Sequence, residues 1–163
     1  MRRIEWDKIK IDDGAYESAG VFDVNKDGKL DIVCGAYWYE APDWKKHKVC
    51  DVMAVDEYYD DFSTIPMDVN GDGYLDLITG GWWGETLVWR ENPKGQPMEW
   101  KTHEIDKCGN IETTRAWDVD GDGELEICPN TPGAPLRFYK LVKSGEKPEF
   151  RKVMVQNEGG SGH

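Results

Sequence analysis

The stretch DVNKDGKLD, residues 23–31, places an acid or an amide at alternate positions and then a glycine. Like charges this close repel each other unless a cation or solvent compensates them. The same pattern returns as DVNGDGYLD at 68–76 and as DVDGDGELE at 118–126. The stretch is therefore one copy of an internal repeat, whose copies begin 45 residues apart (Asp23 to Asp68) and 50 residues apart (Asp68 to Asp118).

Short strand-like segments surround each acidic stretch. One precedes it, a short apolar run follows it, and an aromatic segment such as YWYEAP at 37–42 comes next. A fourth segment begins with an acid and an aromatic residue and then alternates; it occurs at 5–12, 43–50, 99–106 and 149–156. Alternation is typical of a strand with one buried face. Four strands in 45 to 50 residues fit one blade of a β-propeller. An all-β solenoid or a β-sandwich is the competing fold, and the sandwich accounts poorly for a four-element repeat.

The repeat predicts a single all-β domain built from blades of four antiparallel strands. We expect three blades, at about 17–50, 62–105 and 113–156, with a lone outermost strand at 4–12. Residues 157–163, which end in GGSGH, are interpreted as a tail or linker. Closed propellers usually have four to eight blades, so we expect either a fragment of a longer protein or a homo-oligomer in which several chains complete one ring.

The acidic loops have the side chains of a calcium site. Oxygen ligands at positions one, three, five and nine, a glycine at six and a backbone carbonyl at seven can surround one hard cation, and calcium tolerates irregular geometry better than magnesium. The predicted ligands are Asp23, Asn25, Asp27, Lys29 and Asp31; Asp68, Asn70, Asp72, Tyr74 and Asp76; and Asp118, Asp120, Asp122, Glu124 and Glu126. An EF-hand would need a glutamate at position twelve, where Cys34, Thr79 and Pro129 stand. An acidic β-turn without an ion is the alternative.

The loop sequences DVNKDGKLDIV, DVNGDGYLDLI and DVDGDGELEIC resemble the FG-GAP/VCBS repeats of integrin-like β-propellers. The resemblance covers about residues 17–156. It implies calcium in the loop that joins the first two strands of each blade, about three ions per chain, and a secreted, periplasmic or cell-surface location. Glu126 departs from the usual aspartate. The tracts GAYWYEAP at 35–42 and GGWWGETLVWRENP at 80–93 also resemble bacterial propellers related to sugar lyases and aldos-2-ulose dehydratases.

Composition excludes several other classes of protein. The net charge of −12 argues against nucleic acid or an anionic membrane as partner. No run of 18 apolar residues is present, so no membrane insertion is expected, and the first residues lack the apolar stretch of a secretory signal peptide. None of the four cysteines forms a C-x-x-C pair, and we expect buried free thiols rather than disulfides.

Function is expected at the mouth of the propeller channel, in the segments before each innermost strand. Candidate catalytic residues there are Glu17, Asp61, Glu112 and Arg115. Either the chain is a binding or scaffold module for carbohydrate or protein, or it is a sugar lyase or dehydratase in which paired carboxylates act as acid and base. Six aromatic residues are candidates for stacking on sugars, although we expect at least half of them to pack between blades: Tyr37, Trp38, Tyr39, Trp82, Trp83 and Trp89. His47 and His103 occupy equivalent positions in the repeat, which favours a structural role.

Overall fold

The computed structural model describes residues 3–155, and within this range it contains strands, turns and no helix. The predicted all-β class is confirmed. The first sheet consists of β1 (Ala19–Phe22), β2 (Asp31–Cys34), β3 (Tyr37–Glu40) and β4 (Lys45–Lys48). The second consists of β7 (Ile65–Met67), β8 (Asp76–Gly80), β9 (Thr86–Glu91) and β10 (Lys101–Lys107). The third consists of β11 (Thr113–Trp117), β12 (Glu126–Asn130), β13 (Arg137–Lys143) and β14 (Glu149–Met154).

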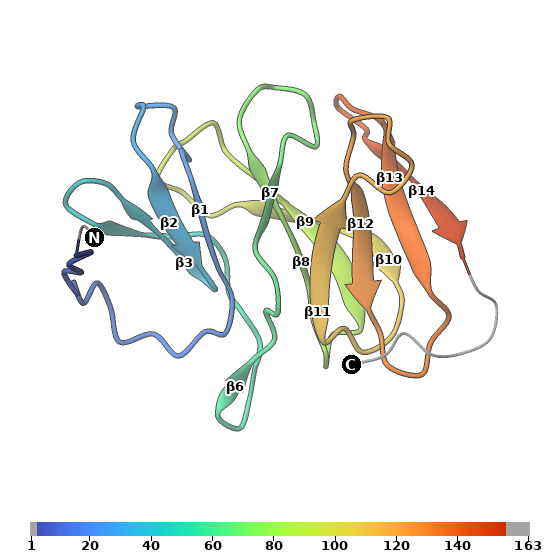
Figure 1. Cartoon of the computed structure of the whole chain (residues 1–163), viewed down its shortest axis with the longest axis horizontal. Coiled ribbons are helices and arrows are strands. Elements are labelled where there is room, and N and C mark those ends of the chain that lie inside the picture. Colours follow the sequence, from blue (N-terminus) through green and yellow to red (C-terminus); the bar gives the residue numbers. More distant parts are fainter. Residues whose placement is uncertain (1–2, 156–163) are drawn as a thin grey trace.

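Each of these sheets is an antiparallel meander in which the strands follow one another in chain order. The first strands of the three sheets lie side by side, because β7 contacts both β1 and β11. The sheets stand next to one another like blades, and they do not close into a ring (Figure 1). A small hairpin of β5 (Ala54–Val55) and β6 (Tyr58–Tyr59), which the sequence did not predict, connects the first sheet to the second. The observed architecture agrees with the predicted partial propeller of four-stranded antiparallel blades.

Apolar side chains fill the two spaces between neighbouring sheets. Between the first and second sheets, Phe22 and Val24 belong to the same buried cluster as Leu77 and Trp100. The second and third sheets share a cluster in which Val69 packs together with residues that include Ile127 and Tyr139. The alternating apolar residues of the strands therefore pack one blade on the next, as the repeat predicts.

The repeat also shows which face of the third sheet is uncovered. Val24, Val69 and Val119 stand at the second position of the three acidic loops. The first two are 0% exposed, whereas Val119 is 51% exposed. Trp117 is likewise 51% exposed, although Phe22 at the equivalent position is 4% exposed. In the first two sheets, the side chains at these positions pack on the next sheet. In the third sheet, no further sheet within residues 3–155 covers Trp117 and Val119.

The prediction of a lone strand at 4–12 is wrong, because this segment has no β-pairing in the structure. Its end nevertheless contacts the first sheet in the way that β10 contacts the third. Asp12 accepts hydrogen bonds from the Tyr39 hydroxyl and the Lys46 ammonium, both at 2.5 Å, as Asp106 does from Tyr139 and Lys152. Without a neighbouring strand to bond its backbone, the segment stays irregular. Residue 156, predicted to end the third blade, and the tail at 157–163 lie outside the described residues.

The packing between the sheets makes a testable prediction about the two repeat-equivalent valines. Val69→Ala removes two buried carbons and leaves a cavity, so we expect a loss of about 2 kcal/mol in the free energy of unfolding. Val119→Ala makes the same change on an exposed face and should stay within about 0.5 kcal/mol of the parent protein. Urea denaturation of both variants measures this difference, and equal effects would contradict the observed packing.

Candidate functional site

The three acidic loops, defined as residues 23–31, 68–76 and 118–126, join the first and second strands of each sheet. They lie at the same end of the molecule, at the top of Figure 1, where they are blue, green and orange. The β5–β6 hairpin extends from the opposite end. Their common position follows from the repeat, because each loop occurs at the same place in an equivalent meander.

A shared set of hydrogen bonds shapes all three loops. The first aspartate of each loop accepts from the amide of the glycine at position six, at 2.9, 2.9 and 3.1 Å. Each position-five aspartate accepts from the amide at position seven, at 2.9, 2.9 and 3.0 Å. The position-six glycines, Gly28, Gly73 and Gly123, have φ of 85°, 86° and 93°, a conformation that glycine adopts without strain. The predicted turn at position six is therefore present in every loop.

The position-nine acid anchors each loop to the sheet. Asp31 accepts from the amides of Val24 at 2.9 Å and Ala41 at 2.8 Å. Asp76 does the same with Val69 at 2.9 Å and Asn92 at 2.8 Å. Both carboxyls are 0% exposed. Burial raises the pKa of Asp76 to about 6 and also raises that of Asp31, although the backbone hydrogen bonds oppose this shift.

An unpartnered oxygen atom in the second acidic loop indicates that this loop fits a cation, separately from the spacing of its ligands. Asp68 Oδ1 is buried, and within residues 3–155 it has no hydrogen-bond partner, while Oδ2 accepts from Gly73. A buried carboxylate oxygen without a partner is costly, and a cation would compensate it. Asn70 and Asp72 of the same loop line a cavity of about 540 Å³ together with Glu91. Amide and carboxylate oxygens thus face accessible space beside this loop, together with the Lys94 ammonium, which lies 3.9 Å from Asp72.

Two glutamates that the sequence analysis missed lie next to the first and second loops. Glu40 accepts from the Asn25 amide at 3.2 Å and pairs with His47 at 2.8 Å. Glu91 pairs with His103 at 2.8 Å and shares the cavity with Asn70. Each histidine stacks on a tryptophan of the neighbouring strand, Trp38 or Trp89, with ring centroids 4.3 and 4.2 Å apart. The repeated Trp–His–Glu arrangement supports the structural role predicted for both histidines.

The third loop differs in its electrostatics. Lys140 of β13 places its ammonium nitrogen 2.8 Å from Asp120, 2.5 Å from Asp122 and 3.0 Å from Glu126. These hydrogen bonds raise the pKa of Lys140 and lower that of Asp122. Carboxylate oxygens of Asp118, Asp120 and Glu126 lie within 4.8 Å of one another. Because an ammonium group already contacts three of the side chains proposed as ligands, the third loop does not fit a calcium ion in this arrangement.

A separate cavity of about 580 Å³ lies among the first strands of the three sheets. Its lining includes Ser18, Ser63 and Thr113, which stand five residues before the first aspartate of each loop. Glu17, Glu112 and Arg115 also line it, so the structure brings three of the four catalytic candidates together. Arg115 donates to Thr113 Oγ1 at 2.8 Å and is exposed.

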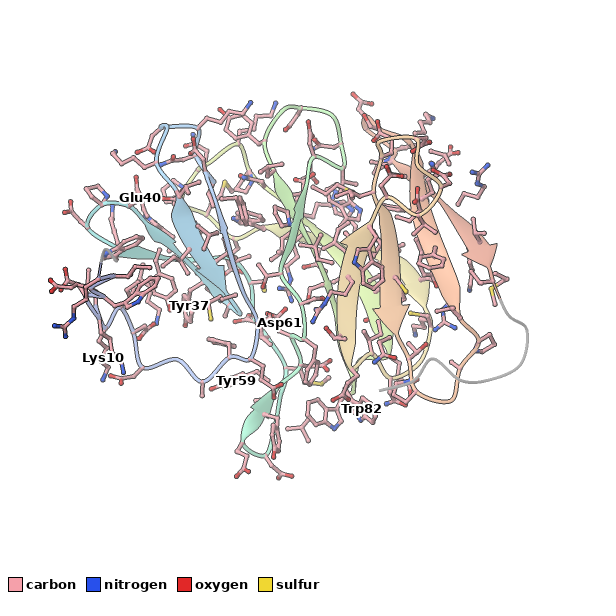
Figure 2. All side chains as sticks on the ribbon, in the orientation of Figure 1. Lys10, Tyr37, Glu40, Tyr59, Asp61 and Trp82 are labelled. Carbon is pink, nitrogen blue, oxygen red and sulfur yellow. The ribbon has the colours of Figure 1, made fainter. Side chains whose placement is uncertain are left out.

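Asp61, the fourth candidate, does not line this cavity. It is 1% exposed and accepts from Arg90 Nη1 at 3.0 Å and Thr79 Oγ1 at 2.9 Å. Burial raises the pKa of Asp61, and the Arg90 guanidinium opposes the rise. In Figure 2, Asp61 lies with Tyr59 and Trp82 in the lower half of the molecule, whereas Glu40 lies in the upper half. Asp61 is thus a buried partner of Arg90, and the pair ties the segment between β6 and β7 to β9.

Five of the six aromatic candidates fall into two groups, and the sixth, Tyr37, is half-buried with its ring 6.3 Å from that of Tyr16. Trp38, Tyr39 and Trp89 are at most 5% exposed. Trp38 and Trp89 belong to the two clusters between neighbouring sheets, whereas Tyr39 donates to Asp12. Trp82 and Trp83 are half-buried and line a second hollow of about 340 Å³ with Tyr58, Phe62, Glu17 and Glu112. Because both hollows contain Glu17 and Glu112, an aromatic surface adjoins the acidic one.

All four cysteines are free thiols in the structure. Cys50, Cys108 and Cys128 are buried, and burial raises the pKa of Cys50 to about 11. No helix in the described range is long and apolar enough to cross a membrane. None of the four thiols lines the cavities described above.

Comparison with known proteins supports the repeat. Residues 68–128 match the sequence family described as FG-GAP-like repeat. The matched range begins at the first residue of the second acidic loop and ends in β12, so it spans one repeat and the whole third loop. The resemblance to FG-GAP/VCBS repeats is therefore confirmed, whereas the resemblance to sugar lyases and dehydratases is not shown. No curated protein and no solved structure gives a significant match to the chain.

The buried pair of Asp61 and Arg90 makes a second testable prediction. Arg90→Met leaves the Asp61 carboxylate uncompensated and should reduce the free energy of unfolding by about 3–5 kcal/mol at neutral pH. The pKa of Asp61 is already raised in the folded protein, and losing Arg90 raises it further. The loss should therefore shrink as the pH falls and Asp61 takes up a proton. Urea denaturation at several pH values tests this, with the exposed Arg151→Met as control; equal losses for the two variants at neutral pH would contradict it.

Proposed function

We propose that this FG-GAP-like repeat protein is a calcium-binding β-propeller module, in which the first and second acidic loops each hold one calcium ion. The observation that carries the proposal is the buried Asp68 Oδ1 without a hydrogen-bond partner. A divalent cation bound at that oxygen would repay the cost of burying it and would neutralise the neighbouring carboxylates. The first loop has the same ligand positions and the same shaping hydrogen bonds.

Calcium suits these loops better than other cations. The donors are carboxylate and amide oxygens with a backbone carbonyl at position seven, and no cysteine or histidine stands among them. Such a hard, irregular oxygen set favours calcium over zinc, and magnesium demands a stricter octahedron. The ions would have a structural role, because the loops lie at the far end of each first strand from the Ser18 and Ser63 positions.

We further propose that the adjoining hollows around Glu17 and Glu112 bind a ligand, with carbohydrate preferred over a protein segment. Trp82, Trp83 and Tyr58 supply aromatic faces on which sugar rings stack, and the two glutamates supply acceptors for sugar hydroxyls. FG-GAP-like repeats are typically extracellular or surface-associated, where such ligands occur.

The calcium proposal is tested by native mass spectrometry and thermal melting. Asp23→Ala and Asp68→Ala should each lose one bound ion, and Glu57→Ala, which removes an exposed acid in the β5–β6 turn, should lose none. Each bound ion should stabilise the fold by about 2.7 kcal/mol when free calcium is about 100 times its Kd, so chelator should lower the melting temperature. Identical masses and melting temperatures with calcium and with chelator would refute the proposal.

Ligand binding is tested on a glycan array with calcium present. We expect a signal that falls at least about tenfold in Trp83→Ala, because the stacking of a sugar ring on the half-buried indole is lost, while the exposed Trp6→Ala leaves it unchanged. Equal binding by Trp83→Ala and the parent protein would exclude this hollow. The alternative, a sugar lyase or dehydratase, would instead be supported by turnover of a sugar polymer that Glu17→Gln and Glu112→Gln abolish without a change in melting temperature.

A further inference from the structure

We propose that the third acidic loop takes no calcium, because the Lys140 ammonium occupies the place of the ion as a cation tethered to the sheet. This inference rests on the proposed calcium binding of the first two loops and assigns a different chemistry to the third. The contacts that carry it are those of Lys140 with Asp120, Asp122 and Glu126, which stand at loop positions three, five and nine. Three of the four side-chain ligand positions thus face one ammonium group.

The strand register shows that this lysine replaces a glutamate of the other repeats. Glu126 pairs with Lys140 across β12 and β13. In the first sheet Ile32 pairs with Tyr39, and in the second Leu77 pairs with Arg90, so the residues opposite Asp31 and Asp76 are Glu40 and Glu91. A negative side chain beside the first two loops has become a positive one beside the third.

A second difference accompanies the first. Position three is Asn25 or Asn70 in the first two loops and Asp120 in the third. In the first repeat the loop residue Asn25 donates to the strand residue Glu40 at 3.2 Å. In the third repeat the equivalent strand residue, Lys140, donates to the equivalent loop residue, Asp120, at 2.8 Å. The contact between loop and strand is retained with its polarity reversed. Paired changes of this kind are expected where a fixed charge has replaced a bound one.

The rest of the Trp–His–Glu arrangement is absent from the third sheet as well. The register places Phe138 and Val153 where Trp38 and His47 pair in the first sheet. The third sheet therefore has no imidazole to hold an acid beside the loop. Lys140 is largely covered, with 12% of its side chain exposed, so its ammonium is held among the carboxylates and does not extend into solvent.

A bound calcium ion and this ammonium exclude each other. The lysine sits within hydrogen-bond distance of the oxygens that the ion would need, and two cations at that spacing repel strongly. The Glu126 oxygen Oε2 remains bonded to the Val119 amide at 2.8 Å, so the loop keeps its anchor without metal. In chelator the third loop should keep the cation that compensates its carboxylates, whereas the first two loops should lose theirs.

The test is a reciprocal count of bound ions by native mass spectrometry. We expect two calcium ions in the parent chain and three in Lys140→Glu, which restores the glutamate of the other repeats. Lys143→Glu makes the same charge change at an exposed position of β13 and should leave two. Three ions in the parent chain would overturn the inference and leave the proposed function intact. Two ions in a folded Lys140→Glu would overturn the role of Lys140.

A second measurement decides the matter where Lys140→Glu fails to fold or the parent chain binds no calcium. Acylation of lysines with an amine-reactive reagent in chelator, followed by peptide mass spectrometry, compares Lys140 with Lys143. We expect Lys140 to react on the order of 10-fold more slowly, because its amine is held by three carboxylates. Equal labelling of the two lysines would overturn the inference. No bound ion in the parent chain would refute the proposed function alone.

Discussion

The structure depends on one buried carboxyl group in each repeat, the acid at position nine of the acidic loop. In the first two sheets this aspartate accepts one hydrogen bond from a backbone amide near the start of its own loop. It accepts a second from the backbone amide of the residue that follows the third strand. It therefore ties the loop, the second strand and the third strand together at one point. Burying an acid is favourable only when such bonds satisfy it, which explains why the loop sequence is repeated so strictly around it. The backbone amide of the position-two valine, Val24 or Val69, is one of these donors. The same hydrogen bond therefore positions the valine side chain against the next sheet.

This anchor also explains how the third repeat tolerates a glutamate. The longer Glu126 side chain still reaches the Val119 amide with one oxygen, while the other turns to Lys140. The loop is thus held by one backbone bond and one ion pair, where the other loops have two backbone bonds. Loop shape is retained because the hydrogen bonds of Asp118 to Gly123 and of Asp122 to Glu124 do not involve position nine.

Much of the fold could be predicted from the sequence, since the repeat sets strand order, loop position and the glycine of the turn. The features that were missed depend on pairing across strands. Nothing in the sequence around Lys140 shows that it faces Glu126, because that contact follows from the β12–β13 register. Asp61 looked like an acid at a channel mouth, but its side chain turns inward to Arg90, which is 29 residues away. The segment at 4–12 has the alternation of a strand, yet a strand forms only where a partner completes its hydrogen bonds.

Solvent exposure gives a physical reason for the different chemistry of the third loop. Val24 and Val69 are buried, so the first two loops lie against a neighbouring sheet, whereas all residues of the third loop before Glu126 are exposed. No neighbouring sheet within residues 3–155 supplies further oxygen ligands to the third loop, and the Lys140 ammonium of its own sheet contacts three of its carboxylates instead. A loop that lies against a neighbouring sheet can be offered further oxygen atoms by that sheet, which suits a cation that takes six to eight oxygen ligands. The same repeated sequence can therefore be completed by an ion where a blade is covered and by a side chain where it is open.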